Sequence, residues 1–234
     1  MSTYTLRDGS KVLDVRLARL QQFDERSKNY PIKAVIGAKP LRSYTWGCGQ
    51  WLDQGTDGAC VGFSWTHELI ARPAMVTGLT NKFAKETVYW EAQKIDEWDG
   101  GSYPGASPVY EGSSVLAGTK VVQKLGYIQE YRWAFSIEEL ALAIGYCGPA
   151  ILGIPWYDGM FNPFSCGHLH VGGKVAGGHA ILCNGVDVKK KVFRLHNSWG
   201  KGWGTNGETL ISWSELDRLL HEGGEACVPM GRIK

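Results

Sequence analysis

The sequence predicts an α+β protein in which a helical lobe precedes a strand-rich lobe. Segments with helical periodicity or helix-capping residues come before residue 150, and short apolar runs between Gly-rich turns come after it. Helices first and strands later are typical of α+β proteins. The length of 234 residues suits one compact unit of two lobes around a cleft, and a hydrophobic content of 44% can supply a sizeable core.

An extended lead-in arm is predicted for residues 1–22, where the apolar pattern is mixed. Four apolar residues could face one side of a short strand there: Val12, Val15, Leu17 and Leu20. Residues 33–52 are predicted to be loop, because proline and glycine interrupt them.

Four helices are predicted before residue 150, over residues 60–71, 85–97, 114–125 and 136–147. Pro73 ends the first, since a proline disfavours helix in the residue before it. Ser113 or Ser114 caps the third helix. The capping box Ser136–Glu139 opens the fourth, which would begin the second lobe. Four strands then follow, over residues 150–154, 179–186, 191–197 and 208–212.

Cys60 is a candidate nucleophile. Small residues surround it in the stretch QGTDGACVGFSW, and apolar residues at helical spacing follow, so the thiol is expected at the first turn of a helix. Unpaired N–H groups at a helix N-terminus stabilise a thiolate, which predicts a lowered pKa for Cys60. The alternative is that Cys60 is a small buried residue, which is the commoner role of a lone cysteine before an apolar helix.

Two later residues complete a catalytic pattern with Cys60. His179 follows two glycines and precedes an apolar run, and Asn197 ends a short strand before a turn rich in Gly and Trp. Cys, His and Asn in this order match triads whose members meet only in the fold. The imidazole would accept the thiol proton, and the Asn197 amide would orient the ring without adding a negative charge.

These motifs resemble the papain family of cysteine peptidases. The motif Q-G-x-x-G-A-C-x-G-F begins at Gln54, G-H-A begins at Gly178, and N-S-W-G-x-G-W-G-x-x-G begins at Asn197. The resemblance covers roughly residues 23–230. It implies a papain-like two-lobe fold over residues 23–234, with a helical lobe at about 48–132, an antiparallel β-barrel-like lobe at about 133–230, and the active-site cleft between them. The resemblance also implies that the N-terminal segment, residues 23–32, crosses from one lobe to the other.

The resemblance also implies roles for individual residues. Cys60 would be the nucleophile, His179 the base, Asn197 the residue that orients the imidazole, and Gln54 the side-chain donor of the oxyanion hole. The implied substrate-binding residues are Gly112, Gly153, Gly178, Ala180 and Trp199. The pocket for the second residue before the scissile bond is expected to be roomy and mainly apolar.

Two positions depart from the family pattern near the nucleophile. Asp57 and Val61 stand where the family usually has a cysteine and a tryptophan. The Asp57 carboxylate is expected to raise the pKa of Cys60 or to meet a basic group of the substrate. Gly178 is expected to leave one wall of the cleft open.

The predicted function is peptide-bond hydrolysis by a thiol protease that forms a thioester acyl-enzyme on a peptide or protein substrate. Two alternatives stay open: an amidase or cell-wall peptide hydrolase of phage or bacterial origin, and a papain-fold structural or binding protein with a residual triad. A net charge of +2 without a basic stripe excludes nucleic acid as the expected partner. No cofactor or metal is expected, because the run of Cys166, His168 and His170 lacks a fourth ligand at a recognisable spacing.

The expected location is cytoplasmic where the protein is made, or in a virion if it is phage-encoded, because no apolar stretch resembles a signal peptide or a membrane span. About twenty residues before the region of resemblance leave no room for a long inhibitory propeptide, so control of activity is expected to come from elsewhere. Free thiols are expected in this setting. Among possible disulfides, the resemblance leaves Cys166 with Cys227 least excluded.

Overall fold

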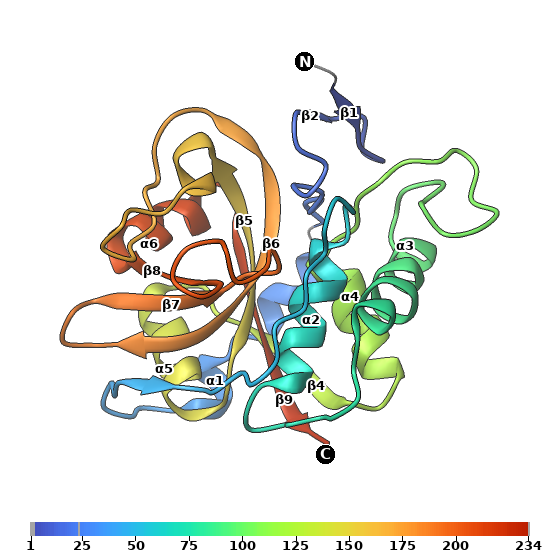
Figure 1. Ribbon diagram of the computed structural model, residues 1–234. Helices are drawn as coiled ribbons and strands as arrows, with labels where there is room; N and C mark the ends of the chain where they lie inside the picture. Colours follow the sequence, from blue (N-terminus) through green and yellow to red (C-terminus); the bar gives the residue numbers. More distant parts are fainter. Residues whose placement is uncertain (1–2, 23, 234) are drawn as a thin grey trace.

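Two lobes, one helical and one built on a sheet, make up the molecule (Figure 1). A computed structural model describes residues 3–22 and 24–233. The helices before residue 125 are η1 (Glu25–Asn29), α1 (Lys33–Ile36), α2 (Cys60–Ile70), the π-helical η2 (Phe83–Tyr89), α3 (Trp90–Ile95) and α4 (Val115–Lys124). The predicted α+β class and the predicted helix at Cys60 are confirmed.

The second lobe is organised on one antiparallel sheet. Its strands are β3 (Tyr44–Thr45), β4 (Ile128–Trp133), β5 (Ala150–Tyr157), β6 (Val175–Asp187), β7 (Val192–His196), β8 (Glu208–Ser212) and β9 (Glu225–Arg232). The order is β4-β9-β5-β6-β7-β8, and β3 pairs with β6. The sheet is not closed into a barrel, because β4 and β8 lie at its two ends and do not pair with each other. The expectation of a barrel-like lobe is therefore corrected.

Side-chain caps set several helix starts. The Ser114 hydroxyl accepts from the Ala117 N–H at the start of α4, and the Ser136 hydroxyl accepts from the Glu139 N–H at the start of α5 (Ile137–Tyr146). A further helix, α6 (Trp213–His221), was not predicted, although Ser212 caps it in the same way. The short helix η3 (Asp158–Phe161) and strands β4 and β9 were also missed.

The apolar core has three parts. One cluster lies in the sheet lobe and packs α5 and α6 against the strands. A second lies in the helical lobe and includes Cys60 and Trp65 of α2 together with Ala180 and Leu182 of β6. Helix α2 therefore packs directly against the sheet. The third cluster is small and belongs to the start of the chain: Leu6, Val12, Ala18 and Leu20.

The start of the chain forms the arm that the sequence predicts. Strands β1 (Tyr4–Thr5) and β2 (Lys11–Val12) pair as a hairpin, which lies over the junction of the two lobes at the top of Figure 1. The chain then passes between the lobes: Arg19 donates its N–H to the Gly178 carbonyl at 3.0 Å, and the Ala18 carbonyl accepts from Ser113 at 3.2 Å. The arm thus forms backbone hydrogen bonds with both lobes.

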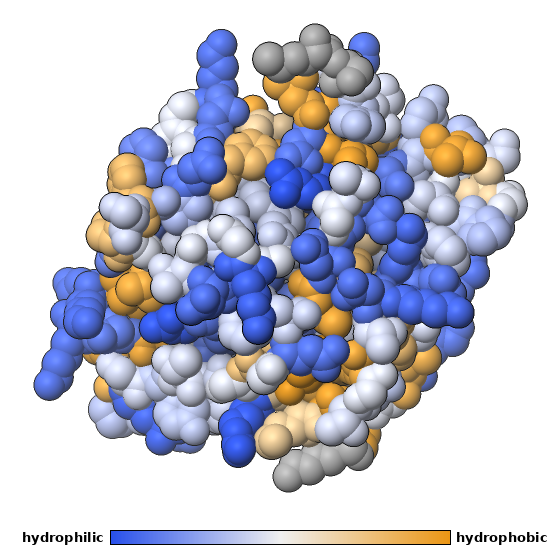
Figure 2. Space-filling view, in the orientation of Figure 1, coloured by the Kyte–Doolittle hydropathy of each residue, from blue (hydrophilic) through white to orange (hydrophobic). Residues whose placement is uncertain are grey.

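All six cysteines are free thiols. Cys166 is exposed whereas Cys227 is buried in the sheet, so the disulfide that the resemblance left least excluded does not form. Over the described residues, no helix is long and apolar enough to cross a membrane. The face seen in Figure 2 is largely hydrophilic, and hydrophobic residues show there in small separate groups.

Candidate active site

Cys60 lies at the first residue of α2 and is fully buried. The chain comes very close to it from two other segments. A Cβ at Gly58 would lie 2.7 Å from the Glu111 Cβ and 3.0 Å from the Ala18 Cβ, so only glycine fits there. Backbone groups of Ala180 and Ala18 lie within hydrogen-bonding reach of the thiol.

His179 and Asn197 are joined by a hydrogen bond. His179 lies on β6 and Asn197 directly follows β7, and these strands are neighbours in the sheet. The distance from His179 Nε2 to Asn197 Oδ1 is 2.8 Å, and both side chains are fully buried. The Trp156 and Trp199 rings lie against the imidazole, with ring centroids 4.7 and 4.8 Å away. Trp199, expected among the substrate-binding residues, thus lies beside the His179 and Asn197 pair.

Gln54 is held in place through Ser198. Its Oε1 accepts from the Ser198 hydroxyl at 2.6 Å, and its Nε2 donates to the Asp57 carbonyl at 2.8 Å and to the Arg16 carbonyl at 3.4 Å. The Ser198 N–H in turn donates to Asn197 Oδ1. The fold therefore brings Gln54, Asn197 and His179 together. The Cys60 thiol lies beside the backbone of Ala180, the residue after His179.

Burial holds both reactive groups in their neutral forms. Desolvation raises the pKa of Cys60 to about 11, above its ordinary 9.0, although backbone N–H groups oppose this. Desolvation also lowers the pKa of His179 to about 4, although the bond to Asn197 and the Arg16 backbone oppose it. The lowered cysteine pKa expected from the helix N-terminus is therefore not found in this state, because the loss of water outweighs the helix terminus.

The arm covers the site. The Arg16 carbonyl lies at Gln54 Nε2, and the Arg16 guanidinium stacks over Trp199 at 4.3 Å while it pairs with Asp14 at 2.6 Å. Two residues further on, Ala18 lies beside the Cys60 thiol. Control of activity was expected to come from elsewhere than a long propeptide, yet the short lead-in itself reaches Gln54 and Cys60.

Glycines of the groove face this arm. A Cβ at Gly178 would lie 2.3 Å from the Arg19 carbonyl oxygen, and its three nearest atoms all belong to Arg19. Gly112 has a φ of +115°, and a Cβ there would meet the Leu20 side chain at 2.9 Å. The wall of the cleft at Gly178 was expected to be open, but the backbone of Arg19 fills the space beside this glycine.

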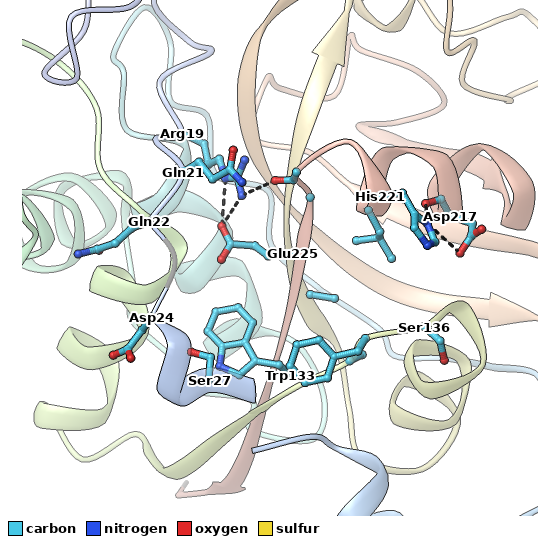
Figure 3. A pocket seen from close by; sticks show the side chains of 16 residues that line it. Arg19, Gln21, Gln22, Asp24, Ser27, Trp133, Ser136, Asp217, His221 and Glu225 are labelled. Carbon is cyan, nitrogen blue, oxygen red and sulfur yellow. Dashed lines mark hydrogen bonds and ion pairs between the residues drawn. The ribbon is translucent and has the colours of Figure 1, made fainter. Parts of the chain in front are cut away.

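The pocket next to Gly153 is acidic. Glu225 of β9 lies opposite Gly153 of β5, and its carboxylate pairs with Arg19 at 2.5 Å (Figure 3). Ala180 is fully buried in the core behind Cys60. The expectation of a mainly apolar pocket is therefore corrected. Strand β9 was not predicted, so its first residue, Glu225, was not expected on the wall of this pocket.

Asp57 does not act on Cys60. Its carboxylate pairs with Lys85 of η2 at 2.9 Å, and both side chains are 36% exposed. The pKa of Cys60 is raised by burial and lowered in part by the nearby backbone and by the charge of Arg19, and Asp57 is not among these causes. The expected influence of Asp57 on the thiol is thus replaced by an ordinary surface ion pair.

Sequence reasoning missed the arginines that hold the arm. Arg7 and Asp96 form an ion pair of 2.7 Å in which neither side chain is exposed, and Arg19 pairs with Glu225. The partners are 89 and 206 residues apart. One feature of the sequence could have indicated these pairs: the arm contains three arginines, Arg7, Arg16 and Arg19, to which no role was given.

The architecture, a helical lobe and an open antiparallel sheet with a Cys and His at their junction, is that of papain-like cysteine proteases. The chain is similar over its full length to xylellain, a cysteine protease from Xylella fastidiosa, with a TM-score of 0.69, 17% identity and 99% of that chain covered. Digestive procathepsin L 3 from Tenebrio molitor gives a TM-score of 0.61 at 18% identity, covering 92% of this chain and 76% of that one.

Bromelain from Ananas comosus, in complex with the E64 inhibitor, gives a TM-score of 0.53 at 15% identity, covering 82% of this chain and 99% of that one. No protein-family model and no curated protein matches the sequence. At these identities the likeness establishes the papain-like fold.

Proposed function

We propose that the chain is a cysteine peptidase that hydrolyses peptide bonds through Cys60, His179 and Asn197, and that its own arm holds it closed. The observation that carries the proposal is the bond of 2.8 Å from His179 Nε2 to Asn197 Oδ1 beside the Cys60 thiol. This bond leaves Nδ1 of the ring without a hydrogen bond of good geometry in the described part of the chain. The Arg16 backbone of the arm lies near the ring, so Nδ1 becomes available to the thiol proton once the arm leaves.

The proposed reaction begins when the arm leaves and water enters. Desolvation then relaxes, and the Cys60 proton passes to His179 Nδ1, which gives a thiolate and an imidazolium. The thiolate attacks the substrate carbonyl carbon, and the imidazolium donates its proton to the leaving amine. Water then hydrolyses the thioester. Gln54 Nε2 and the Cys60 N–H would donate to the oxyanion, and one such donor is typically worth about 3 kcal/mol.

The direction of the arm explains why the protein would not cleave itself there. A substrate would run from the pocket at Gly153 past Cys60 toward His179, since the imidazole must reach the leaving amine. The arm runs the other way: Arg16 lies by Gln54, Ala18 by Cys60 and Arg19 in the pocket. Its peptide bonds are therefore presented in reverse, and the arm would block the cleft without being a substrate.

Hydrolysis of a denatured protein substrate under reducing conditions tests the proposal. Asp96→Asn, which loosens the arm far from the thiol, should hydrolyse the substrate faster than the wild type. Asp96→Asn with Cys60→Ala should show no hydrolysis. The matched control adds Cys48→Ala, another buried cysteine of the helical lobe, whose thiol donates to the Gln50 and His67 carbonyls.

Loss of hydrolysis only with Cys60→Ala supports the peptidase. Equal hydrolysis with and without Cys60 would contradict it. A papain-fold binding protein would leave the substrate intact in all variants, and circular dichroism would verify that each variant is folded.

A further inference from the structure

The Arg7 guanidinium of the arm is bound entirely by the body of the protein. It has five N–H groups, and the ion pair with Asp96 at 2.7 Å uses one of them. Backbone carbonyls accept the other four, and neither side chain of the pair is exposed. We call this set of acceptors the Arg7 socket: the Asp96 carboxylate and the carbonyls of Gln93, Trp98, Asp99 and Gly112.

The socket is held together without the arm. Gln93 lies in the last turn of α3, where carbonyls have no partner within the helix. Its side chain donates to the Gly112 carbonyl at 3.2 Å and to the Tyr89 hydroxyl at 2.9 Å, and that hydroxyl accepts from the Gly112 N–H at 2.7 Å. The Asp96 carboxylate accepts from the Ser113 hydroxyl at 2.8 Å. Because none of these bonds involves the arm, the acceptors stay in place when the arm leaves.

An empty socket would contain a buried carboxylate without a counterion. Within the part of the chain that the structure describes, Arg7 is the one ion-pair partner of Asp96. Burial raises the pKa of Asp96, and the Ser113 hydroxyl and the charge of Arg7 oppose the shift. A buried charge that loses its partner is strongly destabilising. A cation that replaces Arg7 therefore stabilises the open state.

The geometry of the socket selects a guanidinium over other cations. Its acceptors match a planar ion with five N–H groups, whereas an ammonium has three donors and reaches fewer of them. The acceptors bond three different nitrogen atoms of Arg7, so they surround a planar group and do not converge on one point, as the ligands of a metal ion must. The fitting ligand is thus a guanidinium compound.

We propose that the Arg7 socket is a regulatory binding site for a small guanidinium compound, which takes the place of Arg7 and so favours the open arm. The inference rests on the proposed function, in which the arm closes the cleft, but it uses no catalytic step. A tethered arm has an effective concentration in the millimolar range. The ligand therefore acts when its concentration is comparable, and its chemistry is that of a guanidinium with one alkyl substituent, as at the end of an arginine side chain.

Methylguanidinium, which reproduces the end of that side chain, tests the vacated socket in the full-length chain. Nuclear magnetic resonance titration of Arg7→Ala should show saturable binding, with shifts at the Gln93 and Gly112 amides, and it gives the dissociation constant. Arg7→Ala with Asp96→Asn keeps an acceptor for the Ser113 hydroxyl but removes the charge, so binding should weaken at least tenfold. Methylammonium, which has the charge without the planar fork, should also bind Arg7→Ala at least tenfold more weakly.

Arg16→Ala is the matched control variant. It removes another arginine of the arm, whose partner Asp14 belongs to the arm itself and whose ion pair is partly exposed. The Arg7 socket stays filled in this variant. Methylguanidinium should therefore bind it no better than it binds the wild type.

Hydrogen exchange of the wild type tests the regulatory role without depending on a variant that must fold. The Arg7 N–H donates to the Glu111 carbonyl at 3.0 Å, so it exchanges when this part of the arm leaves. A ligand that binds only the open state raises that population by one plus the ratio of its concentration to its dissociation constant. At ten times the dissociation constant, exchange limited by the opening equilibrium should be roughly tenfold faster. The Phe63 N–H of α2 should exchange at an unchanged rate, which excludes general loosening.

The outcomes separate this inference from the proposed function. Binding to Arg7→Ala that depends on Asp96, together with faster exchange at Arg7, supports the inference. Absence of binding, binding that survives Asp96→Asn, or exchange at Arg7 that does not respond to methylguanidinium overturns it. None of these measurements uses hydrolysis, so failure of the guanidinium site leaves the peptidase proposal intact, and loss of the peptidase proposal leaves the guanidinium site intact.

Discussion

Two arginines hold the arm, and their surroundings differ. The Arg7 guanidinium is closed in completely: it pairs with Asp96 at 2.7 Å and donates to backbone carbonyls that include Gln93 at 2.8 Å and Gly112 at 3.2 Å. Arg19 has one carboxylate and one carbonyl, Glu225 and Gly223, beside a cavity. The Arg7 guanidinium is thus fully enclosed, whereas a cavity adjoins the Arg19 guanidinium. The same residue type is completely buried at one end of the arm and borders an open space at the other.

Asp96→Asn should have the largest effect, because it leaves the enclosed Arg7 cation without its carboxylate. Removing one partner of a buried pair typically costs about 3 to 5 kcal/mol. We expect the free energy of unfolding in urea to fall by about that amount. Glu91→Gln in α3, the helix that ends just before Asp96, breaks an exposed pair with Lys94 and should change the free energy of unfolding by less than about 1 kcal/mol. Equal losses in the two variants would mean that the enclosed pair of Arg7 and Asp96 contributes no more than an exposed pair.

Acid should loosen the Arg19 half of the arm before the Arg7 half. The pKa of His179 is about 4 with the arm in place, against an ordinary 6.5, so the open state binds the proton that the closed state excludes. The advantage of the closed state is complete above pH 6.5, is lost as the pH falls toward 4, and amounts to at most about 3 kcal/mol for 2.5 pKa units.

Hydrogen exchange checks this prediction at two amides. After correction for intrinsic rates, protection of the Arg19 N–H, bonded to Gly178, should fall between pH 6.5 and 4 more than that of the Arg7 N–H, bonded to Glu111. His179→Gln should abolish the difference in slope. Parallel loss at both amides would mean that the arm leaves as one unit.

Gly178→Ala should displace the Arg19 half by sterics alone. The added methyl would lie 2.3 Å from the Arg19 carbonyl oxygen, and overpacking typically costs about 1 to 3 kcal/mol. We expect iodoacetamide to label Cys60 roughly tenfold faster. Gly202→Ala is the matched control, because a Cβ there has nothing within 4 Å. An unchanged labelling rate in Gly178→Ala would show that the arm can shift without uncovering the thiol.

The smallest effect is expected from Asp57→Asn, because Asp57 belongs to neither of the ion pairs that Arg7 and Arg19 form. Its pair with Lys85 is well exposed, so its contribution is below about 1 kcal/mol. The pH profile of Cys60 alkylation should stay unchanged. A shift in that profile would restore the influence of Asp57 that the sequence predicts.

Local signals predicted much of the fold and site from the sequence. The small residues before Cys60, the hydroxyl of Ser114 and the Ser136 capping box act over one helical turn, and α2, α4 and α5 begin where they indicate. The turn after Asn197 likewise follows the end of β7, whereas the Gly-rich entry to His179 lies inside β6, which begins at Val175. Helix α6 was missed because Ser212 and Glu215 were not given the same weight as Ser136 and Glu139, and α1 was missed because it has no side-chain cap.

The arm's destination could not be predicted in this way. Its apolar residues are few, and what positions it are long-range pairs such as Arg19 with Glu225, 206 residues apart. The direction of the pKa shift of Cys60 was missed for the same reason. The helix terminus is a local feature, but the exclusion of water from the thiol depends on the arm, which is distant in the sequence. The residues next to Cys60 in the sequence therefore predict neither the ion pair of Arg19 with Glu225 nor the contact of the arm with the thiol.

The arm and the cleft that it fills belong to one polypeptide, which makes closure a unimolecular equilibrium. Diluting the protein leaves the closed fraction unchanged, and a short flexible tether gives the arm an effective concentration in the millimolar range, so a micromolar competitor displaces little of it. One cut between arm and body would change this behaviour, because the released arm becomes an ordinary ligand that dilution carries away. A single broken bond would then convert reversible closure into lasting opening.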